Sequence, residues 1–508
     1  MNSLKISPNP LTKGGIMRIN YLSRQDIKII LHYLGYIMVG IGAILMLPIF
    51  IDLYYLEHSY LIGLIPSALS IGLGFLFVEK FKEYDKLKFK HGMFISSVAW
   101  LWAGFVGAII MMLMLDISFI DAFFENISAW TGSGLTMFND VEILPRSILF
   151  LRSLEQWIGG LGVVIIFISL LIKPGTSAFK LYKSEARDDR IRPNIKNTLK
   201  KTIEIYLIYT LFGIILYILA GLPLFDSVNL TFTTISTGGM SIKNANVGFY
   251  NNNIVYLITM VLMLLGATSF AVHYNIVKTK GKSIIRDIQF QAIILSIIIS
   301  GILIAAITHM APMNVIFHIV SAVTTTGANI ASSSELASWA PASLIIIMVL
   351  MVMGGSSGST VGAVKIIRVI TFLRGINLTV TNVIAPKRVV NTKIASRTFT
   401  QREIKEASSY ISVYLMFLIV SWIIMTFYTN DPINSLFDVT STIGNVGLST
   451  GIINGSLATF PKIMLIFLMW IGRLEIIPIL LTIQLGFRTF DQSLKLAKRK
   501  FRRIINLG

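Results

Sequence analysis

Four short polar stretches, each ending in glycine, interrupt an otherwise apolar sequence. They read TGSG, STGG, TTTG and GNVG. Aligning one glycine from each puts four residues in one register: Gly134, Gly238, Gly327 and Gly447. Six residues before that glycine the second stretch has Phe232, and the other three have serine, at Ser128, Ser321 and Ser441. Such segments offer backbone carbonyl oxygens, which can replace the hydration shell of a monovalent cation.

Each stretch follows a half-length apolar segment that is too short to span a membrane, as in FIDAFFENISAW or MNVIFHIVSAV. Non-helical backbone within a membrane is tolerated only where protein buries it or water lines it, so four such elements imply a central cavity. We predict a cation filter made by Thr131, Gly132, Ser133, Gly134, Ser236, Thr237, Gly238, Thr325, Thr326, Gly327, Asn445, Val446 and Gly447. Polar loops outside the membrane with incidental glycines are the alternative, and the common register of four loops disfavours it.

A second unusual stretch is GGSSGST, which lies inside an apolar segment spanning residues 341–371. Glycine in the middle of a helix costs about 1 kcal/mol relative to alanine, so this run predicts an interrupted helix. Below the filter, such a loop is expected to act as a gate, with these members: Gly354, Gly355, Ser356, Ser357, Gly358, Ser359 and Thr360. Close helix packing through small residues is the alternative. The sequence WIGGLG, residues 157–162, lies inside a spanning segment and predicts packing, not a dinucleotide site.

Arg473 is the most informative charge in the sequence. It lies in the middle of the last apolar segment, where a charged side chain is costly and is expected to face a cavity or a partner. In a pore it would repel resting cations, and we assign it to the gate; the alternative is a buried ion pair. For Glu155 and Glu475, a pairing with another helix is the favoured interpretation.

These residues need a membrane-spanning framework to position them. Of the 508 residues, 54% are hydrophobic and 14% charged, and the sequence contains no cysteine. Soluble domains carry about 25% charged residues, so the chain is predicted to be an integral membrane protein. Ten apolar segments have the length of a spanning helix. They cover residues 29–54, 60–78, 91–115, 147–172, 202–222, 252–277, 288–309, 341–371, 407–428 and 457–487.

The net charge of +19 is distributed in blocks between these segments. All the basic blocks fall on one side if ten helices alternate, which predicts that both termini are cytoplasmic and argues against a nucleic-acid partner. The opposite side is acidic, and an acidic outer vestibule is expected at Asp121, Glu125, Asp226 and Asp438. The basic segments 173–201 and 372–405 are candidate docking surfaces for a regulator or for anionic lipid.

The predicted fold is all-α: two N-terminal helices followed by four repeats of helix, half-helix with loop, and helix around a pseudo-fourfold pore. Repeat 1 covers residues 91–200, repeat 2 residues 201–287, repeat 3 residues 288–405 and repeat 4 residues 406–490. Residues 1–90 hold the cytoplasmic start and the two extra helices, and residues 491–508 form a basic cytoplasmic tail.

Besides the four loops, three stretches are distinctive: QWIGGLGVVII, GGSSGSTVGAVKIIR and GRLE. In these features the sequence resembles the Trk/Ktr/HKT superfamily of potassium transporters over about residues 91–490. The two extra helices are more similar to its TrkH branch than to its KtrB branch. The resemblance implies a bacterial inner-membrane protein in which each protomer of a homodimer has its own K⁺ pore. It implies a cytosolic regulatory subunit of the TrkA or KtrA kind, which binds NAD, ATP or ADP, while this chain binds no nucleotide.

The resemblance also implies roles for residues of this chain: the four aligned glycines as the filter, Gly354 to Thr360 as the gating loop and Arg473 as the constriction. Glycine at all four positions favours K⁺, because members with serine in the first loop tend towards Na⁺. One departure is TGSG in the first loop, where many members read closer to TTTG.

The sequence leaves three classes of function to distinguish. Gated, channel-like K⁺ uptake is the main prediction, and a secondary transporter coupling K⁺ to Na⁺ or H⁺ is the alternative, since such proteins use intramembrane carboxylates and broken helices. A membrane enzyme is disfavoured, because the sequence carries no nucleophile–base pair or metal-ligand cluster.

Overall fold

The computed structural model describes residues 22–57, 59–81, 87–162, 195–384, 393–394, 397–398, 400–474, 476 and 478–489. The basic tail, most of segment 173–201 and Glu475 lie outside the described residues. Within the described ranges the regular secondary structure is helical apart from one pair of two-residue antiparallel strands, β1 (Lys393–Ile394) and β2 (Arg397–Thr398). The prediction of an all-α membrane fold is confirmed.

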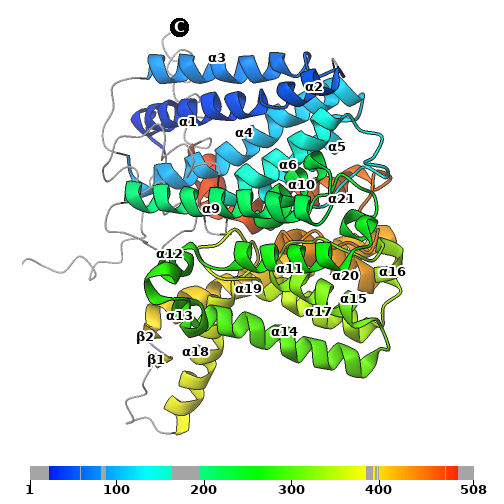
Figure 1. Cartoon of the computed structure of the whole chain (residues 1–508). Coiled ribbons are helices and arrows are strands. Elements are labelled where there is room, and N and C mark those ends of the chain that lie inside the picture. The colour runs from blue at the N-terminus through cyan, green and yellow to red at the C-terminus, as the bar shows by residue number, and fades with distance from the viewer. Residues whose placement is uncertain are drawn as a thin grey trace, which may run out of the picture.

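The N-terminal helices α1 (Arg24–Leu45), α2 (Ile49–Tyr55) and α3 (Leu64–Lys80) form one edge of the bundle (Figure 1). Ser23 is the N-cap of helix α1 and forms a capping box with Asp26. Glycines allow α1 and α3 to pack closely, because a Cβ at Gly35 would lie 2.7 Å from the carbonyl oxygen of Gly74. Small residues at such contacts are typical of helix pairs in membranes.

Four units with a common order follow. The first has α4 (Phe89–Leu115), the half-helix α5 (Phe119–Thr131) and α6 (Arg146–Leu161). The second has α9 (Ile195–Leu219), the half-helix α10 (Leu224–Ile235), the 3-10 helix η1 (Asn246–Tyr250), α11 (Asn253–Ala267), α12 (Phe270–Thr279) and α13 (Lys282–Arg286).

The third unit has α14 (Ile288–Ile307), the half-helix α15 (Pro312–Val323), α16 (Ser333–Ala337), α17 (Pro341–Met353) and α18 (Ile366–Ile384). The fourth has α19 (Gln401–Thr429), the half-helix α20 (Pro432–Gly444), α21 (Thr459–Leu474) and a further helix over Pro478–Thr489. Helix α14 lies at the edge of the molecule opposite α3 (Figure 1).

Fewer helices are straight and continuous than the sequence suggests. Among the described residues, six are long and apolar enough to cross a membrane, and two further pairs reach that length only together, across sharp bends. The predicted helix 252–277 bends by 106° between α11 and α12, where Ser269 caps a new helix. The predicted helix 457–487 bends by 115° after α21. Hydropathy averages over such bends, so a continuous span was the wrong expectation at both places.

The interruption of the helix predicted over 341–371 is present. Helix α17 ends at Met353 and α18 starts at Ile366, and residues 354–365, which we name the intramembrane loop, have no regular structure. Gly354 continues the chain at φ 64°, in the left-handed region that favours glycine.

Polarity is inverted relative to a soluble protein. Large apolar side chains are exposed along α3 and α14, for example Leu69, Leu76, Leu295 and Ile302. Around the ends of the half-helices the interior is rich in buried hydroxyl groups instead. A chain with this distribution places its apolar exterior against lipid and keeps its polar backbone near its own centre.

Candidate functional site

The four half-helices end in the same local structure. After its last turn each chain reverses, and a backbone N–H donates to the carbonyl oxygen five residues earlier. The four bonds measure 2.8–2.9 Å and join Ser133 to Ser128, Gly238 to Thr233, Thr326 to Ser321, and Val446 to Ser441. The segments 131–134, 236–239, 324–327 and 444–447, which we name the filter segments, are thus equivalent by hydrogen bonding as well as by sequence.

Backbone angles fix the register. Each filter segment holds two residues with positive φ, separated by one residue, and these pairs are Gly132 and Gly134, Thr237 and Gly239, Thr325 and Gly327, Asn445 and Gly447. The aligned glycine of repeat 2 is therefore Gly239, and the predicted alignment on Gly238 is wrong by one residue. In the corrected register a hydroxyl residue stands six positions before every glycine, because Thr233 takes the place given to Phe232. That hydroxyl was the signal that sequence reasoning missed.

The filter segments close into a ring. A Cβ added to Gly134 would lie under 3.0 Å from the carbonyl oxygen of Gly238, which precedes the glycine of the next repeat, a separation that real Cβ atoms do not show. The same close approach recurs around the ring. A Cβ at Gly239 would meet the carbonyl oxygen of Thr326, one at Gly327 that of Val446, and one at Gly447 that of Ser133 in the first repeat. The ring needs glycine at these four positions, because any side chain would displace a carbonyl group.

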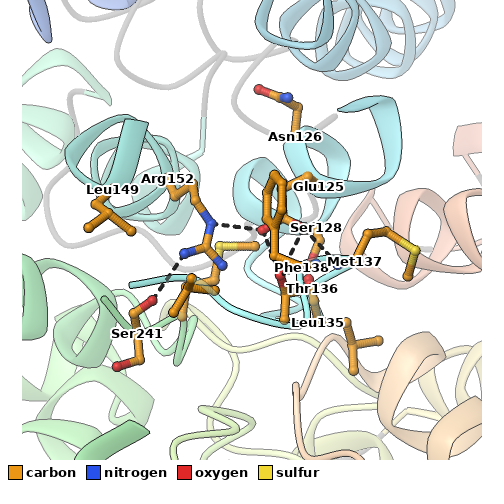
Figure 2. Close-up of polar contacts among 12 residues, drawn as sticks. Glu125, Asn126, Ser128, Leu135, Thr136, Met137, Phe138, Leu149, Arg152 and Ser241 are labelled. Carbon is orange, nitrogen blue, oxygen red and sulfur yellow. Dashed lines mark hydrogen bonds and ion pairs between the residues drawn. The ribbon is translucent and has the colours of Figure 1, made fainter. Parts of the chain in front are cut away.

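Two buried carboxylates hold the chain beyond the ring. Glu125 lies nine residues before Gly134, and its oxygens accept from the Thr136 hydroxyl at 3.0 Å and from the Met137 N–H at 2.9 Å (Figure 2). Arg152 donates to the same carboxylate at 2.7 Å. We name Glu125 and its counterpart in repeat 4, described next, the anchor carboxylates.

Asp438 lies nine residues before Gly447 and has the same role. It accepts from the Ser449 hydroxyl at 2.8 Å, from the Thr450 N–H at 2.8 Å and hydroxyl at 3.0 Å, and from the Ile453 N–H at 3.3 Å. Both anchor carboxylates are fully buried. The other two acidic residues predicted for the vestibule are also engaged: Asp121 pairs with Lys462, and Asp226 accepts from the Tyr250 hydroxyl.

A cavity of about 250 Å³ adjoins the ring on the side of the residues that follow the glycines. All four repeats contribute to its lining, including Gly134, Ser241, Asn329 and Ser449. Among the described residues that line it, Arg152 and Lys243 carry charge and none is Asp or Glu. The expectation that Glu125 and Asp438 face an outer vestibule is therefore wrong, because both are buried inside the fold and this cavity is lined mainly by amide and hydroxyl groups. Asp226 instead lines a neighbouring open cavity together with Glu57 and Glu142.

The intramembrane loop lies against the residues that precede the glycines. The Thr360 hydroxyl lies 3.0 Å from that of Thr237, and the Gly362 N–H donates to the Thr325 hydroxyl at 3.2 Å. A Cβ at Gly362 would lie 2.5 Å from the carbonyl oxygen of Gly444. The loop thus contacts the filter segments of repeats 2, 3 and 4 from one side.

Arg473 completes this contact on the side of repeat 1. Its guanidinium donates to the carbonyl oxygen of Thr360 at 2.6 Å and to those of Gly159 and Gly160 at 2.5 and 3.1 Å. It therefore links the end of α21 to the end of α6 and to the intramembrane loop. Sequence reasoning named the residue but not these carbonyl partners, since they come from segments far apart in the chain.

Glycines also bring the second helix of three repeats against the half-helices. A Cβ at Gly159 would clash with the carbonyl oxygen of Trp130, one at Gly266 with that of Ile235, and one at Gly472 with that of Ile443. The predicted packing role of WIGGLG is confirmed for the described residues. Glu155, in contrast, has no hydrogen-bond partner in the described part of the chain, so the expected pairing is not observed there.

Comparison with known proteins gives a consistent result. The model of the TrkH family of cation transport proteins matches residues 67–297 and 290–487. An uncharacterized cation transporter of Methanocaldococcus jannaschii is 38% identical over 485 residues, which cover 95% of this chain and 100% of the relative. The Trk system potassium uptake protein TrkG of Escherichia coli is 27% identical, over 91% of this chain and 98% of its own. The crystal structure of the potassium transporter TrkH from Vibrio parahaemolyticus superposes with a TM-score of 0.78 at 24% identity, over 89% of this chain and 98% of that one.

Proposed function

The chain belongs to the TrkH family of cation transport proteins, and on this premise we propose that it forms a K⁺-selective, gated, channel-like pore for potassium uptake across the cell membrane. The observation that carries the proposal is the closed ring of four filter segments. Two relatives named as Trk potassium uptake proteins, matched over 91% and 89% of this chain, support potassium as the ion.

In the proposed mechanism, K⁺ loses its water at the filter segments. Carbonyl oxygens of Ser133, Gly238, Thr326 and Val446 lie at one level of the ring, each next to a glycine of the adjacent repeat. Neutral carbonyl groups suit this step, because they replace hydration without trapping the ion by a full charge. The half-helices end at the same level, so their C-terminal dipoles add partial negative charge near a cation.

The intramembrane loop and Arg473 form the proposed gate. With Thr360 bonded to Arg473 and to the carbonyl oxygen of Gly266 at 2.9 Å, the loop fills the space next to three filter segments. A cation leaving the filter there meets a guanidinium charge. Opening requires these bonds to break and the loop to move away from Thr237 and Thr325.

Control by a cytosolic nucleotide-binding subunit and assembly as a homodimer belong to the same proposal, as does a cytoplasmic position for both termini. Three breaks in the helices support control by a partner: the bends after α11 and α21, and the interruption before α18. Each break is a hinge through which a partner bound to the following segment can move the gate. In this arrangement the nucleotide binds to the partner.

The test is uptake of ⁸⁶Rb⁺ into proteoliposomes holding the purified chain, with K⁺ or Na⁺ as competitor, together with rescue of a potassium-uptake-deficient bacterium at low external K⁺. We expect concentrative uptake driven by a negative interior potential, which supplies about 2.3 kcal/mol per charge per 100 mV. Competition by K⁺ and not by Na⁺ supports the filter assignment. Absence of uptake with and without a candidate regulatory subunit contradicts the proposed function.

A secondary transporter coupling K⁺ to Na⁺ or H⁺ is the second candidate, and one observation favours it. Glu155 is a fully buried carboxyl group in α6 that forms no ion pair among the described residues, and intramembrane carboxyl groups of this kind are typical of proton-coupled transporters. The reversal potential distinguishes the two. A channel reverses at the K⁺ equilibrium potential at every pH, whereas proton coupling shifts the reversal with pH, and Glu155→Gln abolishes that shift.

A further inference from the structure

The filter segment of repeat 2 has no anchor carboxylate of its own. Nine residues before Gly239 the sequence has Leu230, where repeats 1 and 4 have Glu125 and Asp438. A leucine side chain cannot accept a hydrogen bond from the chain beyond the ring. Something else must hold this segment in register with its neighbours.

Helix α6 of repeat 1 supplies that support. The Gln156 side chain donates to the carbonyl oxygen of Gly238 at 2.7 Å and accepts from the Met240 N–H at 3.0 Å. One turn earlier, Arg152 donates to the carbonyl oxygen of Ser241 at 3.0 Å (Figure 2). Side chains four residues apart lie on the same helix face, so α6 binds residues 238–241 at three successive points.

The contacts of Gln156 and Arg152 with residues 238–241 lie in the closely packed interior of the protein. Gln156 is fully buried and Arg152 is 2% exposed. Gly238 leaves the space that the Gln156 amide fills, because a Cβ there would lie 2.5 Å from Cδ of Gln156. Arg152 is at the same time bonded to Glu125, so one guanidinium joins the anchor of repeat 1 to the chain just beyond the filter segment of repeat 2.

Equivalent helices lack these donors. The helices can be aligned on the glycines that contact the half-helices, Gly159, Gly266 and Gly472. Three residues before that glycine, α6 has Gln156, α11 has Met263 and α21 has Met469. Arg152 corresponds to Thr259 and Leu465, seven residues before the same glycines. Helices α11 and α21 therefore do not carry the amide and guanidinium donors with which α6 supports repeat 2.

The Gly238 carbonyl belongs to the ring level at which the proposed function places dehydration. We propose that Gln156 and Arg152 are positioning residues that set cation discrimination, by fixing the carbonyl groups of Gly238 and Ser241 relative to the other three repeats. The proposal rests on the proposed function and adds to it a specific source of selectivity outside the filter segments. Gln156 acts on the ring directly, and Arg152 acts through the chain just beyond it.

The experiment compares the ratio of K⁺ to Na⁺ flux in proteoliposomes for the full-length chain and for Gln156→Leu, with Met263→Leu as the matched control in α11. We expect Gln156→Leu to lower the ratio about tenfold, the factor that corresponds to one hydrogen bond of ordinary net strength. Met263→Leu is expected to retain the ratio. Gln156→Glu, which keeps the acceptor for Met240 but changes the donor, is expected to lie between them.

For Arg152, a single substitution leaves Glu125 buried without its cation and risks misfolding, so the double variant Glu125→Gln with Arg152→Gln is used. It removes both charges and retains hydrogen-bonding groups, and its flux ratio is expected to fall about threefold. Monodispersity and thermal unfolding confirm that each variant folds. A Gln156→Leu variant that folds and loses flux while its ratio is unchanged overturns the proposal. A wild-type chain without K⁺ flux contradicts the proposed function instead, so the two failures are distinguishable.

Discussion

Repeats 1 and 4 differ from repeat 3 in how the chain beyond the filter glycine is held. In repeats 1 and 4 a buried carboxylate nine residues earlier accepts several hydrogen bonds from it. Repeat 3 has His318 at that position, and one ring nitrogen of His318 bonds to the carbonyl oxygen of Asn314 in its own helix. The chain after Gly327 is held by neutral bonds, from the N–H groups of Val247 and Gly248 to the carbonyl oxygen of Asn329.

The comparison indicates a division between fixed and movable parts. Hydrogen bonds to a charged group are about twice as strong as neutral ones, so we expect repeats 1 and 4 to form the more rigid side of the ring. Repeat 3 carries the intramembrane loop that contacts its own filter segment through Gly362 and Thr325. In the proposed gating the second helix of repeat 3 rearranges, and repeat 3, like repeat 2, has no anchor carboxylate.

The largest effect is expected from removing an anchor. Asp438→Leu leaves four donors on Ser449, Thr450 and Ile453 without their acceptor, at about 1 kcal/mol each, so the free energy of unfolding falls by about 4 kcal/mol and uptake is lost. Thermal unfolding in detergent and ⁸⁶Rb⁺ uptake measure the two effects. His318→Leu, the same substitution at the equivalent position of repeat 3, is the control and is expected to cost less than about 1 kcal/mol. Equal losses in both variants would refute the division.

The next effect concerns the movable side. Arg473→Ala removes the bonds to Thr360, Gly159 and Gly160, so the intramembrane loop is released and uptake without a regulatory subunit is expected to rise about 10-fold to 100-fold. Arg473→Lys, which keeps the charge and loses the fork of donors, separates repulsion from tethering. Uptake in Arg473→Ala at or below the wild-type level would contradict the gate.

A third prediction tests the corrected register of repeat 2. Gly239→Ala places a Cβ against the carbonyl oxygen of Thr326 at φ 70°, and the ratio of K⁺ to Na⁺ flux is expected to fall more than about tenfold. Gly238→Ala meets the side chain of Gln156 instead of backbone, and a smaller fall is expected. A larger effect at Gly238 would restore the alignment that the sequence suggested.

The smallest effect is expected at a surface carboxylate. Asp226→Asn keeps an acceptor for the Tyr250 hydroxyl and removes a charge that does not line the cavity next to the ring, so uptake is expected to change less than about twofold at low ionic strength. The measurement is initial uptake in about 10 mM and about 150 mM salt. A large drop at low salt alone would show that surface acids concentrate the cation after all.

Much of the arrangement follows from local sequence. The half-helices, the glycine-ended segments and the interrupted helix at GGSSGST each depend on neighbouring residues, so their patterns are legible in one sequence. The register of repeat 2 was missed because two consecutive glycines, Gly238 and Gly239, offer both alignments and only backbone angles choose between them. Glu125 and Asp438 were assigned to the vestibule because a carboxylate near an outer loop normally faces water.

The sequence alone determined that the chain spans a membrane, that it repeats one unit four times, and that glycines end each half-helix, because hydropathy, period and backbone freedom are properties of short segments. The tertiary structure alone decided which carbonyl faces which glycine, that Arg152 and Gln156 serve the neighbouring repeat, and that Arg473 bonds three carbonyl groups. Those contacts join residues up to 314 positions apart, and nothing in a linear pattern specifies a partner at such a distance.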